Sequence, residues 1–140
     1  MDAIAFALIA ALAGGAYSVL QRIAAPGIHQ AFGALLISLT AALVSAIALI
    51  CIRDQNPLYS DVRVLPWLGL IGAAAFSIDY FSLLAYSRGL SVSVGSPIFI
   101  GVSIVTASLA GFALGEAVTL MKLLGIGLIV LGAVIVTALA

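Results

Sequence analysis

Five long apolar runs dominate the sequence, and none of them carries more than one charged side chain. A helix that crosses a membrane needs about 20 mainly apolar residues, so each run is long enough to span. Barrel strands would instead alternate apolar and polar residues over about ten positions. The sequence therefore predicts an all-α membrane protein with a single transmembrane domain over residues 1–140. The expected spans cover residues 3–22, 30–52, 65–87, 92–114 and 120–140.

The composition excludes an ordinary soluble domain. Of the 140 residues, 65% are hydrophobic and 7% are charged, whereas soluble domains are about 25% charged. A small domain has too much surface for its volume to hide so many apolar side chains, so lipid must surround most of them. We expect a multi-pass protein of the cell (inner or plasma) membrane, with the lipid bilayer as its partner.

The first apolar run, with its Ala-Leu-Ala stretch at Ala11–Ala13, resembles a secretory signal. However, Asp2 precedes it, no Lys or Arg does, and the apolar run continues to Leu20. A signal peptide needs a positive start and a short apolar core, so we interpret this segment as the first span.

The basic residues between the spans are almost evenly divided between the two sides of the membrane. Arg53, Arg63 and Lys122 fall on the side of the N-terminus, and Arg22 and Arg88 fall on the other. Because Lys and Arg favour the cytoplasmic side, this division gives a weak preference for a cytoplasmic N-terminus. The alternative is that both orientations insert, which would allow an antiparallel dimer.

Asp79 is the charged residue nearest the middle of any predicted span. It lies about three residues past the midpoint of residues 65–87, which is roughly 5 Å from the midplane at the rise of a helix. An ionised carboxylate there costs on the order of 3 kcal/mol, and such residues usually mark ion, proton or substrate paths. Asp79 is therefore the first candidate for a substrate or proton site. The alternative is a protonated side chain that bonds a neighbouring helix.

Small and polar residues share one face of the third span. Gly72, Ala75, Asp79, Ser82 and Tyr86 recur at spacings of three and four residues. This face suits a bundle interior or a wet cavity, although small residues also serve close packing. The candidate lining residues are Asp79, Tyr80, Tyr86, Tyr17, Gln21, Ser82 and Ser96.

The fourth span carries two features of its own. Ser103, Ala107, Gly111 and Gly115 recur every four residues, which predicts a packing ridge against another helix or a second copy of the chain. Pro97 removes a backbone donor and opens the helix near Ser93. Such breaks line cavities in transporters but also occur as plain kinks.

No pattern for catalysis, metal binding or cofactor binding occurs in the sequence. The acids other than Asp79 lie in loops or near the terminus, His29 is alone, and Cys51 is a single cysteine. No basic stripe for nucleic acid is present. The sequence predicts a protein that is not an enzyme, has no metal and no cofactor, and binds no nucleic acid.

Four ordered motifs in the C-terminal two-thirds of the chain resemble a known family. They are Leu84–Leu90 (LAYSRGL), Gly95–Phe99 (GSPIF), Leu114–Thr119 (LGEAVT) and Leu124–Gly132 (LGIGLIVLG). Together they resemble an EamA-type repeat of the drug/metabolite transporter superfamily. The resemblance implies five-helix repeats that usually occur as an inverted pair in ten-helix proteins, and one repeat should not enclose a path. It therefore implies a homodimer, which an antiparallel arrangement would suit, or a heterodimer with an inverted homologous chain.

These observations favour a small secondary transporter or facilitator of small metabolites or drug-like molecules, acting as a dimer of five-helix units. Coupling to protons through Asp79 is a hypothesis within this interpretation. Two alternatives remain open: a non-transporting membrane subunit, and a lipid-carrier flippase subunit that works with a partner chain.

Overall fold

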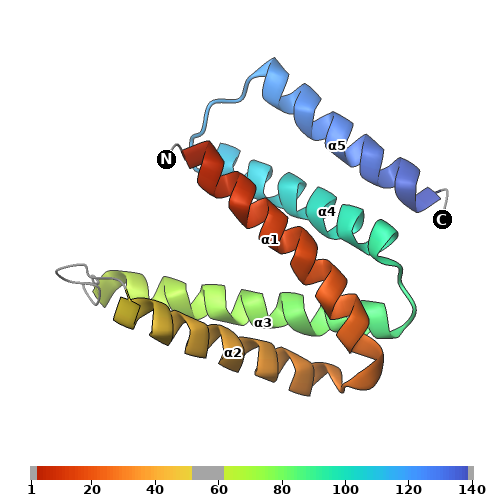
Figure 1. Cartoon of the computed structure of the whole chain (residues 1–140). Coiled ribbons are helices and arrows are strands. Elements are labelled where there is room, and N and C mark those ends of the chain that lie inside the picture. Colours follow the sequence, from red (N-terminus) through yellow and green to blue (C-terminus); the bar gives the residue numbers. More distant parts are fainter. Residues whose placement is uncertain (1–2, 52–61, 139–140) are drawn as a thin grey trace. The chain divides into compact units, whose positions relative to one another are not determined.

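The structure is a computed structural model that describes residues 3–51 and 62–138. Within those residues the regular elements are helices (Figure 1). They are α1 (Ala3–Ala24), η1 (Ala25–Gly27), α2 (Gln30–Cys51), η2 (Val62–Val64), α3 (Leu65–Ser87), α4 (Val92–Ala113) and α5 (Leu120–Ala138). The α-helices make five candidate membrane spans by length and composition. The predicted all-α membrane fold is confirmed.

Parts of the predicted organisation lie outside the described residues. They are the ends of the second and fifth predicted spans, at residues 52 and 139–140, and most of the loop between α2 and α3, including Arg53. The basic residues that the structure describes stand at helix ends or in short connections. Arg22 lies in the last turn of α1, and Lys122 lies in the first turn of α5.

Lipid explains both the helices and their apolar surfaces. In hydrocarbon no water can bond a backbone N–H or C=O group, so a spanning segment must satisfy these groups within itself. The helices accordingly expose large apolar side chains outward, for example Leu12 at 76%, Ile50 at 83% and Met121 at 80%. In a soluble protein such surfaces would be a liability, whereas in a bilayer they are the expected exterior.

The described chain forms two compact units, and α1 contributes to both. One unit comprises Gln21–Arg88 and contains the last turn of α1, η1, α2 and α3. The start of α2 lies beside the end of α3, where the Gln30 side-chain amide donates to the Ser87 hydroxyl at 3.0 Å. The two helices therefore form an antiparallel hairpin, and α3 also contacts η1.

Gly33 allows α2 to approach α3 closely. A Cβ atom added at Gly33 would lie 2.8 Å from Cδ1 of Leu83 and 3.3 Å from Cγ2 of Ile28. Leu83 is fully buried at 1% exposure, so its side chain has little room to yield. Small residues at helix interfaces let backbones approach, which is the main source of packing energy between helices in lipid.

The other unit comprises Met1–Leu20 and Gly89–Ala140, and its best-packed part is the pair α4 and α5. A Cβ atom added at Gly101 of α4 would lie 3.1 Å from Cβ of Ala133 in α5. Two small residues thus meet where these helices cross. Helix α5 begins with the Thr119 hydroxyl accepting a bond from the Lys122 N–H at 3.3 Å, which is an N-cap contact.

The end of α4 is a Schellman motif. The Glu116 N–H bonds the Gly111 carbonyl at 3.0 Å, and the Gly115 N–H bonds the Phe112 carbonyl at 3.1 Å. Gly115 adopts φ +93°, a left-handed conformation that costs least for glycine. This cap satisfies carbonyls that the helix end would otherwise leave unpaired. It also fixes the direction in which the chain leaves α4.

We expect Gly33→Ala to destabilise the α2–α3 hairpin, because the added methyl group overlaps the side chain of Leu83. Overpacking typically costs about 1–3 kcal/mol. The matched control is Gly72→Ala in α3, where an added Cβ meets nothing within 4 Å. That control should be neutral or gain up to about 1 kcal/mol from helix propensity. Thermal unfolding of both variants in detergent measures the difference, and equal melting temperatures would contradict the close approach at Gly33.

Candidate functional site

Three buried polar residues form a cluster in the Gln21–Arg88 unit. Asp79 and Ser82 lie on α3, and Gln21 lies in the last turn of α1. Their side chains are 7%, 4% and 4% exposed, respectively. Polar residues at this depth in a membrane protein are costly, so they normally face the protein interior or a water-filled path. We call Gln21, Asp79 and Ser82 the polar cluster.

The amide of Gln21 connects the other two members of the polar cluster. Its Nε2 donates to Oδ1 of Asp79 at 3.3 Å, and its Oε1 accepts from the Ser82 hydroxyl at 2.8 Å. The Ser82 hydroxyl also lies 3.2 Å from the Asp79 backbone carbonyl. Because both ends of the amide are used, the orientation of the Gln21 side chain is fixed by the network.

This arrangement can hold the carboxyl group of Asp79 in either protonation state. An amide N–H can donate to a carboxylate oxygen or to the carbonyl oxygen of a neutral carboxylic acid. The polar cluster can therefore position a carboxyl group that exchanges a proton or a cation.

The two tyrosines of α3 differ in their surroundings. Tyr86, seven residues beyond Asp79 on the same face, is fully buried at 0% exposure. Tyr80 is half-buried, stacks on Phe76 with ring centroids 6.2 Å apart, and meets Phe81 edge-on at 5.2 Å. The ring of Tyr80 is thus held by aromatic neighbours of its own helix.

The predicted small and polar face of α3 is buried over part of its length. Gly72 and Ala75 are exposed, whereas Asp79, Ser82 and Tyr86 are buried. The reason is that η1 and the Gln21 turn of α1 lie against the C-terminal half of α3. The buried polar region is therefore confined to that half.

Tyr17 and Ser96 belong to the other unit. Tyr17 is half-buried on α1, and Ser96 is half-buried on α4, one residue before Pro97. The hydroxyl oxygen of Ser96 is itself buried, and it makes no hydrogen bond to any residue that the structure describes. A buried hydroxyl without a partner costs about 1–3 kcal/mol, so this atom requires an explanation.

The four residues of the predicted ridge on α4 have different environments. Ser103 and Ala107 are exposed, whereas Gly111 is buried. A Cβ atom added at Gly111 would lie 3.0 Å from Cδ of Glu116, so the glutamate side chain covers this glycine. Gly115 follows the end of α4 and serves the helix cap, so the ridge on the helix itself extends from Ser103 to Gly111.

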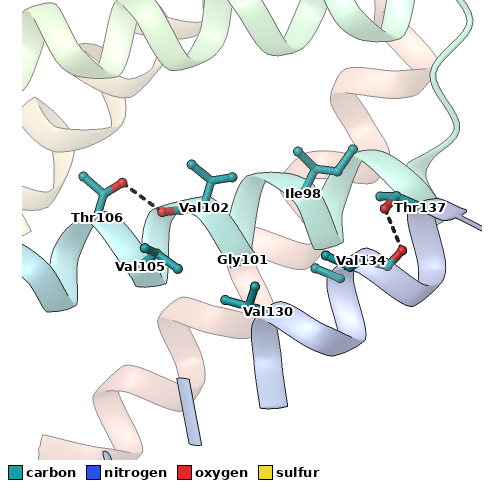
Figure 2. A pocket seen from close by; sticks show the side chains of 9 residues that line it. Ile98, Gly101, Val102, Val105, Thr106, Val130, Val134 and Thr137 are labelled. Carbon is teal, nitrogen blue, oxygen red and sulfur yellow. Dashed lines mark hydrogen bonds between the residues drawn. The ribbon is translucent and has the colours of Figure 1, made fainter. Parts of the chain in front are cut away.

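A groove between α4 and α5 was not found from the sequence. Figure 2 shows it, with a cavity volume of about 260 Å³. Its lining residues are Ile98, Gly101, Val102, Val105, Thr106, Val130, Ala133, Val134 and Thr137. Both threonine hydroxyls turn back to their own helices, Thr106 to the Val102 carbonyl at 2.9 Å and Thr137 to the Val134 carbonyl at 2.8 Å. The groove therefore presents an almost entirely apolar surface to any occupant.

Comparison with known proteins identifies the family. The model of the EamA-like transporter family matches residues 1–138, nearly the whole chain. The chain belongs to the EamA-like transporter family. No curated protein and no solved structure matches the sequence significantly. The family assignment confirms the resemblance drawn from the four motifs, and it identifies a multi-pass membrane protein of a class that transports small substrates.

The polar cluster of this EamA-like chain offers groups that form hydrogen bonds. Among residues 3–51 and 62–138 no group of three or more His, Cys, Asp or Glu side chains could hold a metal ion. The polar cluster combines one carboxyl, one carboxamide and one hydroxyl group. Such a set can form reversible hydrogen bonds to polar groups.

We expect the Gln21–Ser82 bond to couple α1 to α3 in this EamA-like unit. Gln21→Leu and Ser82→Ala should each destabilise the protein, and a double-mutant cycle should give a coupling energy of about 0.5–2 kcal/mol, the range for interhelical bonds in membranes. The control is Thr40→Val in α2, whose hydroxyl bonds the Leu36 carbonyl of its own helix. Unfolding in mixed micelles measures these energies. Strictly additive effects would contradict the bond.

Proposed function

We propose that this chain is a secondary transporter or facilitator of small metabolites or drug-like molecules in the cell membrane, and that Asp79 binds the substrate or a coupling proton. One observation carries the proposal: the polar cluster of Gln21, Asp79 and Ser82 is buried inside helices that are otherwise apolar. Membership of the EamA-like transporter family supports transport as the activity.

Asp79 is the member of the polar cluster that can change its charge. It lies well inside α3, whereas Arg22 and Lys122 lie in the end turns of their helices. A group that gains and loses charge within the membrane can bind its ligand on one side and release it on the other. Gln21 and Ser82 support this role because their bonds keep the carboxyl group in place.

The path is completed by a second repeat. Transporter folds of this kind place their binding site between repeats of opposite orientation, so a lone repeat supplies one wall. The nearly even division of Lys and Arg between the two sides supports an antiparallel homodimer. Pairing with an inverted homologous chain is the alternative arrangement.

Orientation of the C-terminus tests the antiparallel homodimer. We expect comparable signals from reporters that are active only in the cytoplasm and only outside it, when each is fused to the C-terminus of a chain with native loops. A single orientation would overturn the homodimer and favour an inverted partner chain. The control is to add two lysines beside Arg88, which should shift the population strongly to one orientation.

Asp79→Asn tests the role of the carboxyl group. The asparagine can still accept the bond from Gln21, so the variant should insert and fold. Bonds to charged groups contribute about 1.5–3 kcal/mol, so substrate or proton binding should weaken about 10- to 100-fold. The measurement is uptake of radiolabelled amino acids, supplied one at a time, into proteoliposomes that hold the purified chain and carry a pH gradient.

Glu116→Gln is the matched control for Asp79→Asn, because it removes a carboxylate that is exposed in the α4–α5 connection. It should leave uptake unchanged. Full uptake by Asp79→Asn would remove Asp79 from the mechanism. Uptake by the purified chain alone would also exclude the alternative of a non-transporting subunit.

The groove between α4 and α5 favours one second candidate, a lipid-carrier flippase subunit that works with a partner chain. Its almost entirely apolar lining suits a long hydrocarbon tail better than a polar metabolite. Val105→Asp would place a carboxyl group in this groove and should stop the movement of a fluorescent polyprenyl-phosphate across the bilayer. Such movement without metabolite uptake would establish the second candidate over the first.

A further inference from the structure

Three basic residues lie at one end of the unit that contains the polar cluster. Arg22 lies in the last turn of α1, His29 directly precedes α2, and Arg88 is the C-cap of α3. The end of α1, the start of α2 and the end of α3 meet at this end of the unit (Figure 1). We call Arg22, His29 and Arg88 the basic patch.

A hydrogen bond between helices places His29 beside Arg88. The Gln30 side-chain amide donates to the Ser87 hydroxyl at 3.0 Å, and these two residues are the chain neighbours of His29 and Arg88. Both basic side chains are exposed. The start of α2 and the end of α3 therefore present an imidazole and a guanidinium group at the same membrane surface.

Arg22 lies near the same surface, slightly deeper in the membrane. It follows Gln21, whose Oε1 atom accepts a bond from the Ser82 hydroxyl at 2.8 Å. Ser82 is six residues before Arg88, which is roughly 9 Å along α3 at the rise of a helix. Long basic side chains near the end of a membrane helix extend toward the headgroup layer. The guanidinium group of Arg22 is thus directed to the layer in which Arg88 lies.

No acidic residue of the neighbouring sequence balances the charge of the basic patch. Residues 21–30 and 80–91 contain no Asp or Glu. Asp79 is the acidic residue of this unit that the structure describes, and it bonds Gln21 inside the span. Neither Arg22 nor Arg88 forms an ion pair with a residue in 3–51 or 62–138. The basic patch is therefore complementary to an anion from outside the chain.

Exposed apolar side chains lie directly beside the basic patch. Ile23, which follows Arg22, is 71% exposed, and Phe32, one helical turn after His29, is 54% exposed. A free phosphate ion would contact the basic groups alone. A membrane lipid would contact the basic groups with its phosphate and the apolar side chains with its acyl chains. The combination favours a lipid with an anionic headgroup.

We propose that the basic patch binds the phosphate of an anionic membrane lipid of the phosphatidylglycerol type. Guanidinium groups bind phosphate oxygens through parallel N–H bonds, and a ring N–H of His29 can donate another. Basic groups between membrane helices hold lipid phosphates in this way. The bound lipid would connect the ends of α1 and α3 outside the polar cluster. The proposed transport function does not use this surface, so failure of either proposal leaves the other standing.

Quenching by brominated lipids tests this proposal. The reporter is Phe32→Trp in a Trp67→Phe background, because Trp67 lies at the start of α3, far from the basic patch. The full chain is reconstituted in vesicles of phosphatidylcholine and phosphatidylglycerol, with bromine on the acyl chains of one lipid or the other. The ratio of the two quenching curves gives the relative binding constant beside the reporter. Brominated lipids occupy both leaflets, so the readout does not depend on the orientation of the chain.

We expect phosphatidylglycerol to bind beside the reporter at least about fivefold more tightly than phosphatidylcholine, since one basic residue near an anionic lipid contributes about that factor. Arg22→Gln combined with Arg88→Gln should bring the ratio close to one. The matched control is Lys122→Gln, which removes a basic residue from α5 in the other unit and should leave the ratio unchanged. A ratio near one in the reporter protein itself would overturn the lipid site.

Salt provides a second measurement that needs no change to the basic patch. Added salt screens exposed charges, so the ratio should fall toward one. A ratio that salt leaves unchanged would contradict binding by the basic patch. Inorganic phosphate, added at constant ionic strength, distinguishes a free anion from a lipid. If it displaces phosphatidylglycerol, the basic patch takes a free anion and the lipid site is refuted. Weak and equal quenching by both lipids would show that protein covers the reporter, which also refutes the lipid site.

Discussion

Inside the membrane, each polar group of this protein must find a hydrogen-bond partner in the protein, because water is absent there. Long helices satisfy the backbone within each span, and the side-chain hydroxyls of Ser18, Thr40, Ser77 and Thr106 bond carbonyls of their own helices. Most of the surface can therefore be hydrocarbon at little cost. The side chains that hydrogen-bond from one helix to another, above all the Gln21 amide, are exceptions to this pattern of bonding within one helix.

The Gln21–Arg88 unit contains polar bonds between its helices. In the Gln21–Arg88 unit, Gln21 joins α1 to α3 through Asp79 and Ser82, and Gln30 joins α2 to α3 through Ser87. The close approach at Gly33 lies in the same end of the hairpin. By contrast, α4 and α5 meet through small and aliphatic side chains such as Gly101 and Ala133. The first unit is therefore suited to holding a site, and the second to lateral contact with hydrocarbon.

The fold could be predicted because its signal is local. Length and lack of charge alone define the five helices, and a spacing of three and four residues places Asp79, Ser82 and Tyr86 on one face of α3. The contacts could not be predicted in the same way. Nothing in the α1 sequence indicates that the Gln21 amide meets Asp79, since this depends on the angle at which η1 redirects the chain. The four-residue spacing predicted that Gly115 belongs to the packing ridge, but its left-handed backbone ends α4. The spacing could not separate the two roles, because glycine suits both packing and capping.

The position of Asp79 along α3 would make a charged ligand at the proposed site sensitive to the membrane potential. Asp79 lies eight residues before the last residue of α3, about one third of the length of a 23-residue helix. An elementary charge that crosses the whole membrane gains or loses about 2.3 kcal/mol per 100 mV. A charge that reaches Asp79 from the Ser87 end crosses about one third of that field, or roughly 0.8 kcal/mol per 100 mV. Approach to one Asp79 from the two ends of α3 is thus electrically unequal.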